Sequence, residues 1–115
     1  MKRVIVCIIF VFALHIACVH DAKAQYRSFV SGNELFDGLQ YAQDTWQYRY
    51  AAGYIFGVAD TGNGTWFTFS PKVDRHKVLD TVTKYLVAHP QERNLPAAMA
   101  VVRALRTIST TPQKK

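Results

Sequence analysis

The sequence predicts an all-α domain, a small orthogonal bundle of about four helices with one irregular loop rich in glycine and aromatic residues. Two observations favour this class. Apolar residues recur at three- and four-residue spacing through most of the chain after residue 30, and the alternating pattern of strands is almost absent. Capping residues, glycines and prolines divide this pattern into four segments, with no linker or internal repeat between them.

The first helix is expected to begin at the stretch Ser31-Gly-Asn-Glu34. This stretch fits a capping box, in which the Ser31 hydroxyl reaches the Glu34 amide and the Glu34 carboxylate reaches back. Apolar residues follow with helical spacing, so one face of this helix should be buried. They are Leu35, Phe36, Leu39, Ala42 and Trp46.

A second helix is predicted from about Asp44 to Asp60. Gly53 and Gly57 lie one turn apart on a shared face, where small residues most often let another helix approach closely. A membrane span is not expected, because charged residues at positions 49 and 60 bracket too short a segment. The stretch Thr61-Gly-Asn-Gly64 should break this helix.

Two further helices are predicted beyond the irregular loop. Asp74 is a suitable N-cap for the third helix, which should end at His89-Pro90. Asn94 can cap the fourth helix, with Pro96 in its first turn. The predicted apolar faces are Val78, Leu79, Val82, Tyr85 and Leu86 in the third helix, and Ala97, Val101, Ala104, Leu105 and Ile108 in the fourth.

The first 24 residues have the pattern of a secretory signal peptide. Lys2 and Arg3 precede an apolar run over residues 4–17, and Ala22-Lys23-Ala24 places small residues at the two positions that a signal peptidase reads. We therefore expect residues 1–24 to be removed after Ala24. Residues 25–115, which are 91 of the 115 residues, should then form one exported domain without a membrane span.

Charge and cysteine content exclude several classes of function for this domain. The segment 1–24 contains three of the 14 basic and one of the eight acidic residues, so the remainder has a net charge of +4. Its basic residues are scattered, which favours a solvated surface over a nucleic-acid site. Both cysteines, Cys7 and Cys18, lie in the segment to be removed, so the domain should have no disulfide, thiol nucleophile or cysteine metal site.

The tripeptide Asp60-Thr61-Gly62 matches the catalytic sequence of aspartic proteases. In those enzymes two such loops meet in a β-rich fold, and their carboxylates share one proton. Here the tripeptide follows a helical pattern, and no second loop is found. A protease is thus a remote alternative. Asp60 is better interpreted as a residue at a helix end, with Gly62 or Gly64 in the positive-φ conformation that terminates it.

Other catalytic or cofactor chemistry finds no support in the sequence. The glycine-rich stretch follows a helix and leads into aromatic residues, whereas a phosphate-binding loop leads from a strand into a helix. Asp60, Asn63 and Thr65 do not have the spacing of a calcium loop. His76 and His89 fall at opposite ends of one predicted helix. We predict no catalytic residue, no cofactor and no metal.

Trp66 and Phe67 leave two alternatives open. They directly follow the flexible turn, so exposed rings would be natural anchors for a protein partner. Aromatic residues are more often largely buried, and in that case the two rings would fill the core.

Several segments together resemble the Tai-type immunity proteins, which are periplasmic antagonists of the cell-wall amidase effectors delivered by type VI secretion. The resemblance extends in the same order over residues 31–110. The segments that carry it are Ser31-Gly-Asn-Glu-Leu35, Gly53-Tyr-Ile-Phe-Gly-Val-Ala-Asp60, Phe69-Ser-Pro71, Lys84-Tyr-Leu-Val-Ala-His-Pro90 and Ala104-Leu105.

The resemblance implies a helical, periplasmic protein without catalysis of its own, often a homodimer, that fills or caps the catalytic cleft of an amidase. Because loops often carry binding function, we expect contact through the loop between Asp60 and Phe69 and the start of the next helix. The candidate partner-binding residues are Asp60, Asn63, Trp66, Phe67 and Arg75.

The chain departs from the family pattern at its cysteines. Family members typically carry cysteines near four positions, which here are Leu39, Ala51, Phe69 and Thr110. A lost disulfide typically costs about 2–5 kcal/mol in a small secreted domain. Burying a Leu or Phe side chain contributes about 1.5–3 kcal/mol, so we expect packing to replace the disulfides in part.

The resemblance also supplies an alternative function. The fold of this family is similar to that of small periplasmic acid-stress chaperones, so a general protein-binding module is the second hypothesis. Such chaperones expose apolar surface when acid changes their charge. Residues 25–115 contain only seven acidic residues, which gives acid little charge to change.

Overall fold

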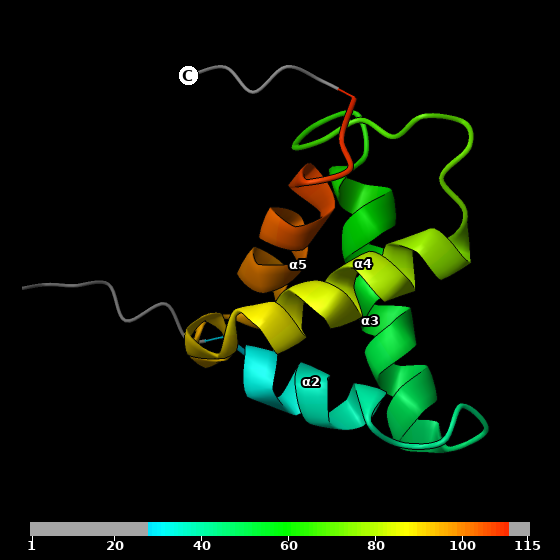
Figure 1. Ribbon diagram of the computed structural model, residues 1–115. Coiled ribbons are helices and arrows are strands. Elements are labelled where there is room, and N and C mark those ends of the chain that lie inside the picture. The colour runs from blue at the N-terminus through cyan, green and yellow to red at the C-terminus, as the bar shows by residue number, and fades with distance from the viewer. Residues whose placement is uncertain (1–27, 111–115) are drawn as a thin grey trace, which may run out of the picture.

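Within residues 28–110, which the computed structural model describes, the chain forms four α-helices and one short 3-10 helix (Figure 1). The prediction of an all-α fold is confirmed. The expected signal peptide, residues 1–24, lies outside the described residues. None of the described helices is both long and apolar enough to cross a membrane. The elements are α2 (Gly32–Leu39), α3 (Trp46–Gly62), α4 (Arg75–Ala88), η1 (Pro90–Asn94) and α5 (Ala97–Arg106).

The helices pack across one another rather than side by side along a common axis. In Figure 1, α4 crosses in front of α3 and α5, and α2 lies below them near the N-terminal half of α3. Helix α5 contacts each of the other elements, α2, α3, α4 and η1. Helices α2 and α4 likewise contact every other element, so the bundle is closely connected throughout, and α5 buries half of its residues within it.

Side-chain caps fix where three of the helices begin. The predicted capping box is present, since the Ser31 hydroxyl accepts from the Glu34 amide at 3.2 Å and the Ser31 amide donates to the Glu34 carboxylate at 2.7 Å. The predicted Asp74 cap is also present, and its carboxylate accepts from the Lys77 amide at 2.8 Å. Thr45, which the sequence analysis did not identify, caps α3.

The end of the first helix differs from the prediction. Helix α2 ends at Leu39, Ala42 lies in the turn that follows, and Trp46 is the first residue of α3 with 72% of its surface exposed. The Ala42 carbonyl accepts from both the amide and the hydroxyl of Thr45, which closes the turn before the Thr45 cap starts the next helix. The local turn and cap thus override the apolar spacing on which the longer helix was predicted.

The start of the last helix also differs. Asn94 is the final residue of η1, and Pro96 precedes α5 without any side-chain cap. Backbone bonds to residues at the start of α2 hold this segment instead. The Val30 carbonyl accepts from the Ala97 amide at 2.9 Å, and the Gly32 amide donates to the Leu95 carbonyl at 2.9 Å.

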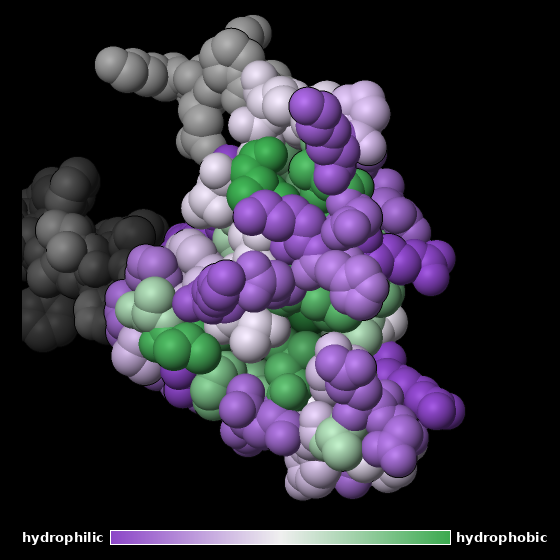
Figure 2. Space-filling model, turned by 45° about the vertical axis from the view of Figure 1, so that its right-hand side comes forward, coloured by the Kyte–Doolittle hydropathy of each residue, from purple (hydrophilic) through white to green (hydrophobic). Residues whose placement is uncertain are grey.

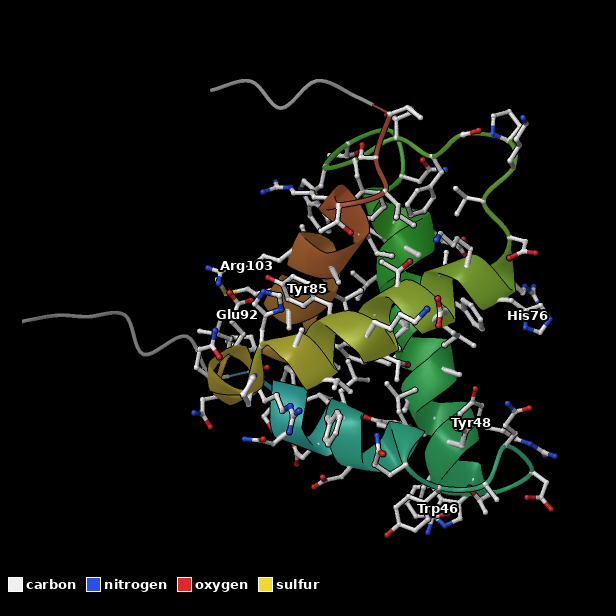
Figure 3. All side chains as sticks on the ribbon, in the orientation of Figure 1. Trp46, Tyr48, His76, Tyr85, Glu92 and Arg103 are labelled. Atoms are coloured by element: carbon white, nitrogen blue, oxygen red, sulfur yellow. The ribbon has the colours of Figure 1, made fainter. Side chains whose placement is uncertain are left out.

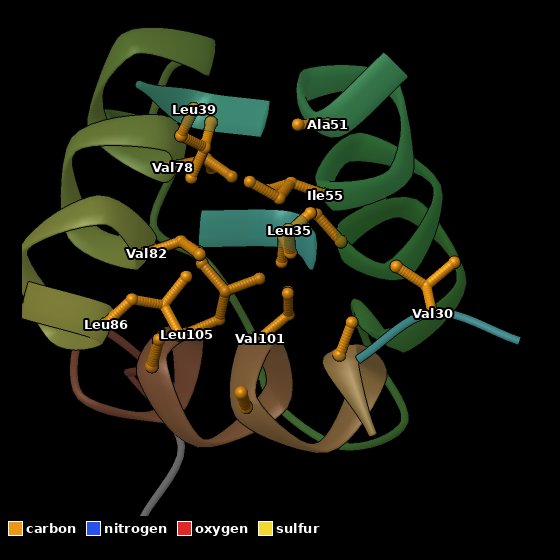
Figure 4. Packing of buried hydrophobic residues seen from close by; sticks show 14 of the residues in the cluster. Val30, Leu35, Leu39, Ala51, Ile55, Val78, Val82, Leu86, Val101 and Leu105 are labelled. Atoms are coloured by element: carbon orange, nitrogen blue, oxygen red, sulfur yellow. The ribbon is translucent and has the colours of Figure 1, made fainter. Parts of the chain in front are cut away.

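A single apolar core lies where the helices meet, and none of the described residues places a polar or charged side chain inside it (Figure 4). The predicted faces of α4 and α5 are largely confirmed, because Val78, Val82 and Leu86 are buried and α5 buries five of its ten residues. Hydrophilic side chains cover most of the face seen in Figure 2. The largest fully buried side chains are Leu35, Ile55, Val82, Leu86, Val101 and Leu105.

The expected role of Gly53 and Gly57 is wrong within this chain. Both residues are exposed, and a β-carbon added at either position would meet no atom within 4 Å. Helix α3 turns a different face to the core, the one that carries Ala51, Ile55 and Ala59. The two glycines therefore accept no other helix of the described domain.

A polar network joins α4, η1 and α5 on the surface (Figure 3). The Tyr85 hydroxyl donates to one oxygen of the Glu92 carboxylate at 2.7 Å, and Arg103 contacts the other oxygen at 3.1 Å. The Tyr85 hydrogen bond is the main cause that lowers the pKa of Glu92, with the positive charge of Arg103 adding to it. Burial, followed by the Glu92 bond, raises the pKa of Tyr85.

Replacing Gly53 or Gly57 by alanine is expected to stabilise the isolated protein by about 0.5–1 kcal/mol each. Alanine loses less backbone entropy than glycine on entering a helix, and the added methyl group meets open space. Urea denaturation measures the change in the free energy of unfolding. A loss of stability at either position would show that another surface occupies this face in solution.

Tyr85→Phe is expected to lower the free energy of unfolding at pH 7. The difference in this free energy between the variant and the wild type should become smaller as the pH falls. The pKa of Glu92 is lower in the folded state than its unfolded value of about 4.3, so its carboxylate stabilises the fold at pH values above about 4.3. This stabilisation is lost as the pH falls through the folded-state pKa. The variant lacks the main cause of that lowered pKa.

Urea denaturation at about pH 7 and pH 3 tests this prediction, with both values chosen to bracket the carboxylate pKa range. Tyr50→Phe is the matched control, because Tyr50 is exposed on α3, away from this network. If the two variants showed the same dependence on pH, the Tyr85–Glu92 bond would not stabilise the fold.

Candidate functional site

The candidate site is built around the aromatic loop, residues 63–69, which follows α3. Gly62 ends the helix against the loop itself, since a β-carbon there would lie 2.6 Å from the Phe67 ring. Gly64 has a φ of +83°, so it is the glycine that takes the predicted positive φ, and its amide donates to the Phe67 carbonyl at 2.7 Å. The Asn63 side chain accepts from the Phe69 amide at 3.2 Å. The loop is thus a closed turn.

Of the two alternatives for the aromatic pair, burial in the core applies to Phe67 and exposure to solvent applies to Trp66. Phe67 is 2% exposed and stacks on Phe69 with ring centroids 4.9 Å apart, so its ring belongs to the core. Trp66 is 47% exposed. Phe67 must therefore be removed from the partner-contact candidates in this conformation, because the fold covers its ring. Trp66 remains accessible.

Residues after α5 hold the aromatic loop from the other side. The Thr68 carbonyl accepts from the Thr110 amide at 2.9 Å, and the Thr68 amide donates to the Ser109 hydroxyl at 3.0 Å. The Arg106 side chain donates to the Trp66 carbonyl at 3.3 Å. These bonds fix the backbone on both sides of the buried Phe67 ring.

Three of the predicted partner-binding residues line one cleft. It lies between the last turn of α3, the aromatic loop and the first turn of α4, and its volume is about 370 Å³. Asp60, Asn63 and Arg75 contribute to its wall, and the Arg75 guanidinium lies 5.5 Å from the centre of the Phe56 ring. The structure therefore brings these three residues together.

Trp66 lies apart from that cleft. It lines a separate groove with residues of α5, including Met99 and Arg106, which the sequence analysis did not select. Met99 falls outside the apolar positions 97, 101, 104 and 105 predicted to face the core. A single apolar residue on the outer face of a helix is common on protein surfaces, so this signal alone does not identify a binding surface. The groove that Met99 lines with Trp66 and Val102 becomes visible only in the structure.

The catalytic and metal-binding alternatives find no support in the geometry of residues 28–110. Asp60-Thr61-Gly62 lies inside the last turn of α3 rather than between strands, so it lacks the context of an aspartic protease loop. No group of three His, Cys, Asp or Glu side chains within residues 28–110 could hold a metal ion. His76 is exposed in the first turn of α4, whereas His89 caps the other end and stacks on Tyr85.

The four positions at which the resemblance implies cysteines fall into two neighbourhoods. Leu39 and Ala51 are both buried, and Gly38 packs against the Ala51 side chain so closely that a β-carbon at position 38 would lie 2.9 Å from it. At the other end of α3, Phe69 directly follows Thr68, to which Thr110 is hydrogen-bonded. The first neighbourhood joins α2 and α3 across a turn, and the second joins the aromatic loop to the distant segment after α5.

A comparison with protein families matches residues 13–108 to the Rap1a immunity proteins. The chain belongs to the Rap1a immunity protein family. It is therefore an immunity protein, which binds and neutralises a cognate toxin and is not an enzyme. A comparison with individual curated proteins found no match. The expected membership of an immunity protein family is confirmed by the Rap1a match, and the Tai-type assignment stays a prediction.

Gly62→Ala is expected to destabilise this Rap1a-family protein by about 1–3 kcal/mol. The added methyl group would lie 2.6 Å from the Phe67 ring, which is buried and stacked on Phe69, so the ring would have to shift. Thermal or urea denaturation gives the change in the free energy of unfolding. Gly53→Ala, the same substitution in the same helix, is the control, and equal effects of the two variants would contradict the role given to Gly62.

Proposed function

We propose that this immunity protein acts in the periplasm, where it binds and blocks a peptidoglycan amidase effector delivered by type VI secretion. Membership of the Rap1a family supports binding to a toxin. The segments that resemble Tai-type proteins support an amidase as that toxin, and the signal-peptide pattern of residues 1–24 supports export. Family membership also favours immunity over the chaperone-like alternative.

The observation that supports the aromatic loop as the binding site is that Trp66 is exposed while the loop backbone is held in place. Its neighbour Phe67 is buried, and hydrogen bonds on both sides hold the backbone, so the indole ring projects from a preorganised support. A rigid aromatic anchor loses little conformational entropy on binding, and tryptophan is enriched among residues that dominate binding energy. Trp66 is suited to enter a concave surface of a partner.

The cleft beside the loop supplies polar contacts for the same partner. The exposed Asp60 carboxylate can accept hydrogen bonds, and the exposed Arg75 guanidinium offers N–H donors. Inhibition in this proposal is steric, because the bound loop covers the substrate cleft of the amidase. A homodimer, which the resemblance implies, is part of the proposal, and light scattering during size-exclusion chromatography measures it.

The decisive experiment is co-purification of residues 25–115 with the amidase candidate encoded beside the gene, followed by an assay of peptidoglycan cleavage. Trp66→Ala is expected to weaken binding at least about tenfold, which is the effect of an interface residue worth more than 1 kcal/mol. Trp46→Ala is the matched control, because Trp46 is also exposed and begins α3 (Figure 3). Trp66 lies beyond the other end of that helix.

The outcomes separate the parts of the proposal. A wild-type protein that neither binds nor inhibits the enzyme would reject the amidase as partner. Inhibition that survives in a folded Trp66→Ala variant would remove Trp66 from the site. Cell fractionation of the full chain tests the compartment, and retention of the protein in the cytoplasm would reject the periplasmic assignment.

A further inference from the structure

We propose that the groove between Trp66 and α5 binds an acidic amphipathic segment of the partner protein. An apolar side chain of that segment would enter between Trp66 and Met99, and its carboxylates would contact Arg103 and Arg106. This inference rests on the proposed function, in which the partner is a toxin. It adds a second contact surface to the cleft beside Asp60 and specifies the chemistry of what binds there.

The groove is formed by one face of α5 and the aromatic loop, and its volume is about 390 Å³. The residues Met99, Val102, Arg103 and Arg106 are spaced by three or four positions, so they lie on one side of the helix. Ala98 and Trp66 complete the lining. The groove therefore has a mainly apolar floor with two guanidinium groups among its walls.

The two large exposed apolar residues of the groove, Trp66 and Met99, lie outside the core, whereas Val102 is partly buried against it. Helix α5 already buries Ala97, Ala100, Val101, Ala104 and Leu105 on its other side. Met99 remains 44% exposed and Trp66 47% exposed, so the folded chain leaves both in contact with water. Tryptophan, methionine and arginine are the residue types enriched in protein interfaces, and methionine adapts its shape to different apolar partners.

The charges around the groove favour an acidic occupant. Neither α5 nor the aromatic loop contains an acidic residue. Among the ion pairs of residues 28–110, none involves Arg106, whose Nε donates to the Trp66 carbonyl. Arg103 contacts Glu92 through one nitrogen, and its side chain is 44% exposed. A guanidinium group has five N–H donors, so both arginines can still bind a carboxylate.

The apolar floor distinguishes a protein segment from a nucleic acid or a simple anion. Nucleic-acid affinity comes mainly from many phosphate contacts by basic residues, and here only two arginines line the groove. An amphipathic segment can satisfy both features at once, since it places apolar and acidic side chains on neighbouring positions.

The test measures, by titration calorimetry, the affinity of residues 25–115 for the purified peptidoglycan amidase that is the candidate effector of the proposed function. Met99→Ala and Arg106→Glu are each expected to raise the Kd at least about tenfold. Arg106→Gln should also reduce the dependence of the Kd on salt, because one charge contact is lost. Arg49→Glu is the charge-matched control on the exposed face of α3 and should change the Kd less than about twofold.

Each outcome bears on a different proposal. If the wild type does not bind the effector, the proposed function is rejected and this inference with it. If the wild type binds and the folded Met99→Ala and Arg106→Glu variants bind equally well, the groove is rejected while the function stands. Binding of the wild type to phosphatidylglycerol vesicles that is lost in both variants, with effector binding unchanged, would assign the groove to a membrane surface and overturn the inference.

Discussion

The fold depends on the close approach of α5 to every other helix. Three alanines on its inner face, Ala97, Ala100 and Ala104, are completely buried, and their small side chains let the neighbouring backbones come near. Larger residues, Val101 and Leu105, fill the spaces between them. Burial of this face removes apolar surface of α5 and of the neighbouring helices from water, so a short helix makes close-packed contacts with several others.

The position of α5 also determines what the other side of that helix can do. Its inner face supplies most of the packing, so Met99 stays exposed and lines a groove, which Val102 also lines while it is partly buried against the core. The turn after α5 holds the aromatic loop through Ser109 and Thr110, so the same helix that organises the core places Trp66 beside Met99. The core and the exposed surface are two faces of one element.

Local sequence rules predicted the four helices well and their tertiary environment less well. Ser31 and Asp74 were found because a cap acts through the nearest turn, and the face of α4 because its apolar residues keep one spacing. The role predicted for Gly53 was wrong because residue spacing shows that a helix face carries small residues but does not show whether another helix covers that face. Trp66 and Phe67 could not be assigned separately because the geometry of the loop, with Gly64 at positive φ, decides which ring turns inward.

The same dependence on packing links stability to recognition. The domain has no cysteine after residue 24, so no covalent bond can hold the aromatic loop against the segment that ends at Thr110. Burial of Phe67 and a few hydrogen bonds to Thr68 hold it instead. A bond of this kind contributes about 0.5–1.5 kcal/mol, so the loop opens more easily than a disulfide-linked one would. Any change that loosens the core beneath Phe67 should therefore also weaken the presentation of Trp66, and the cost would appear as lost affinity before the whole domain unfolds.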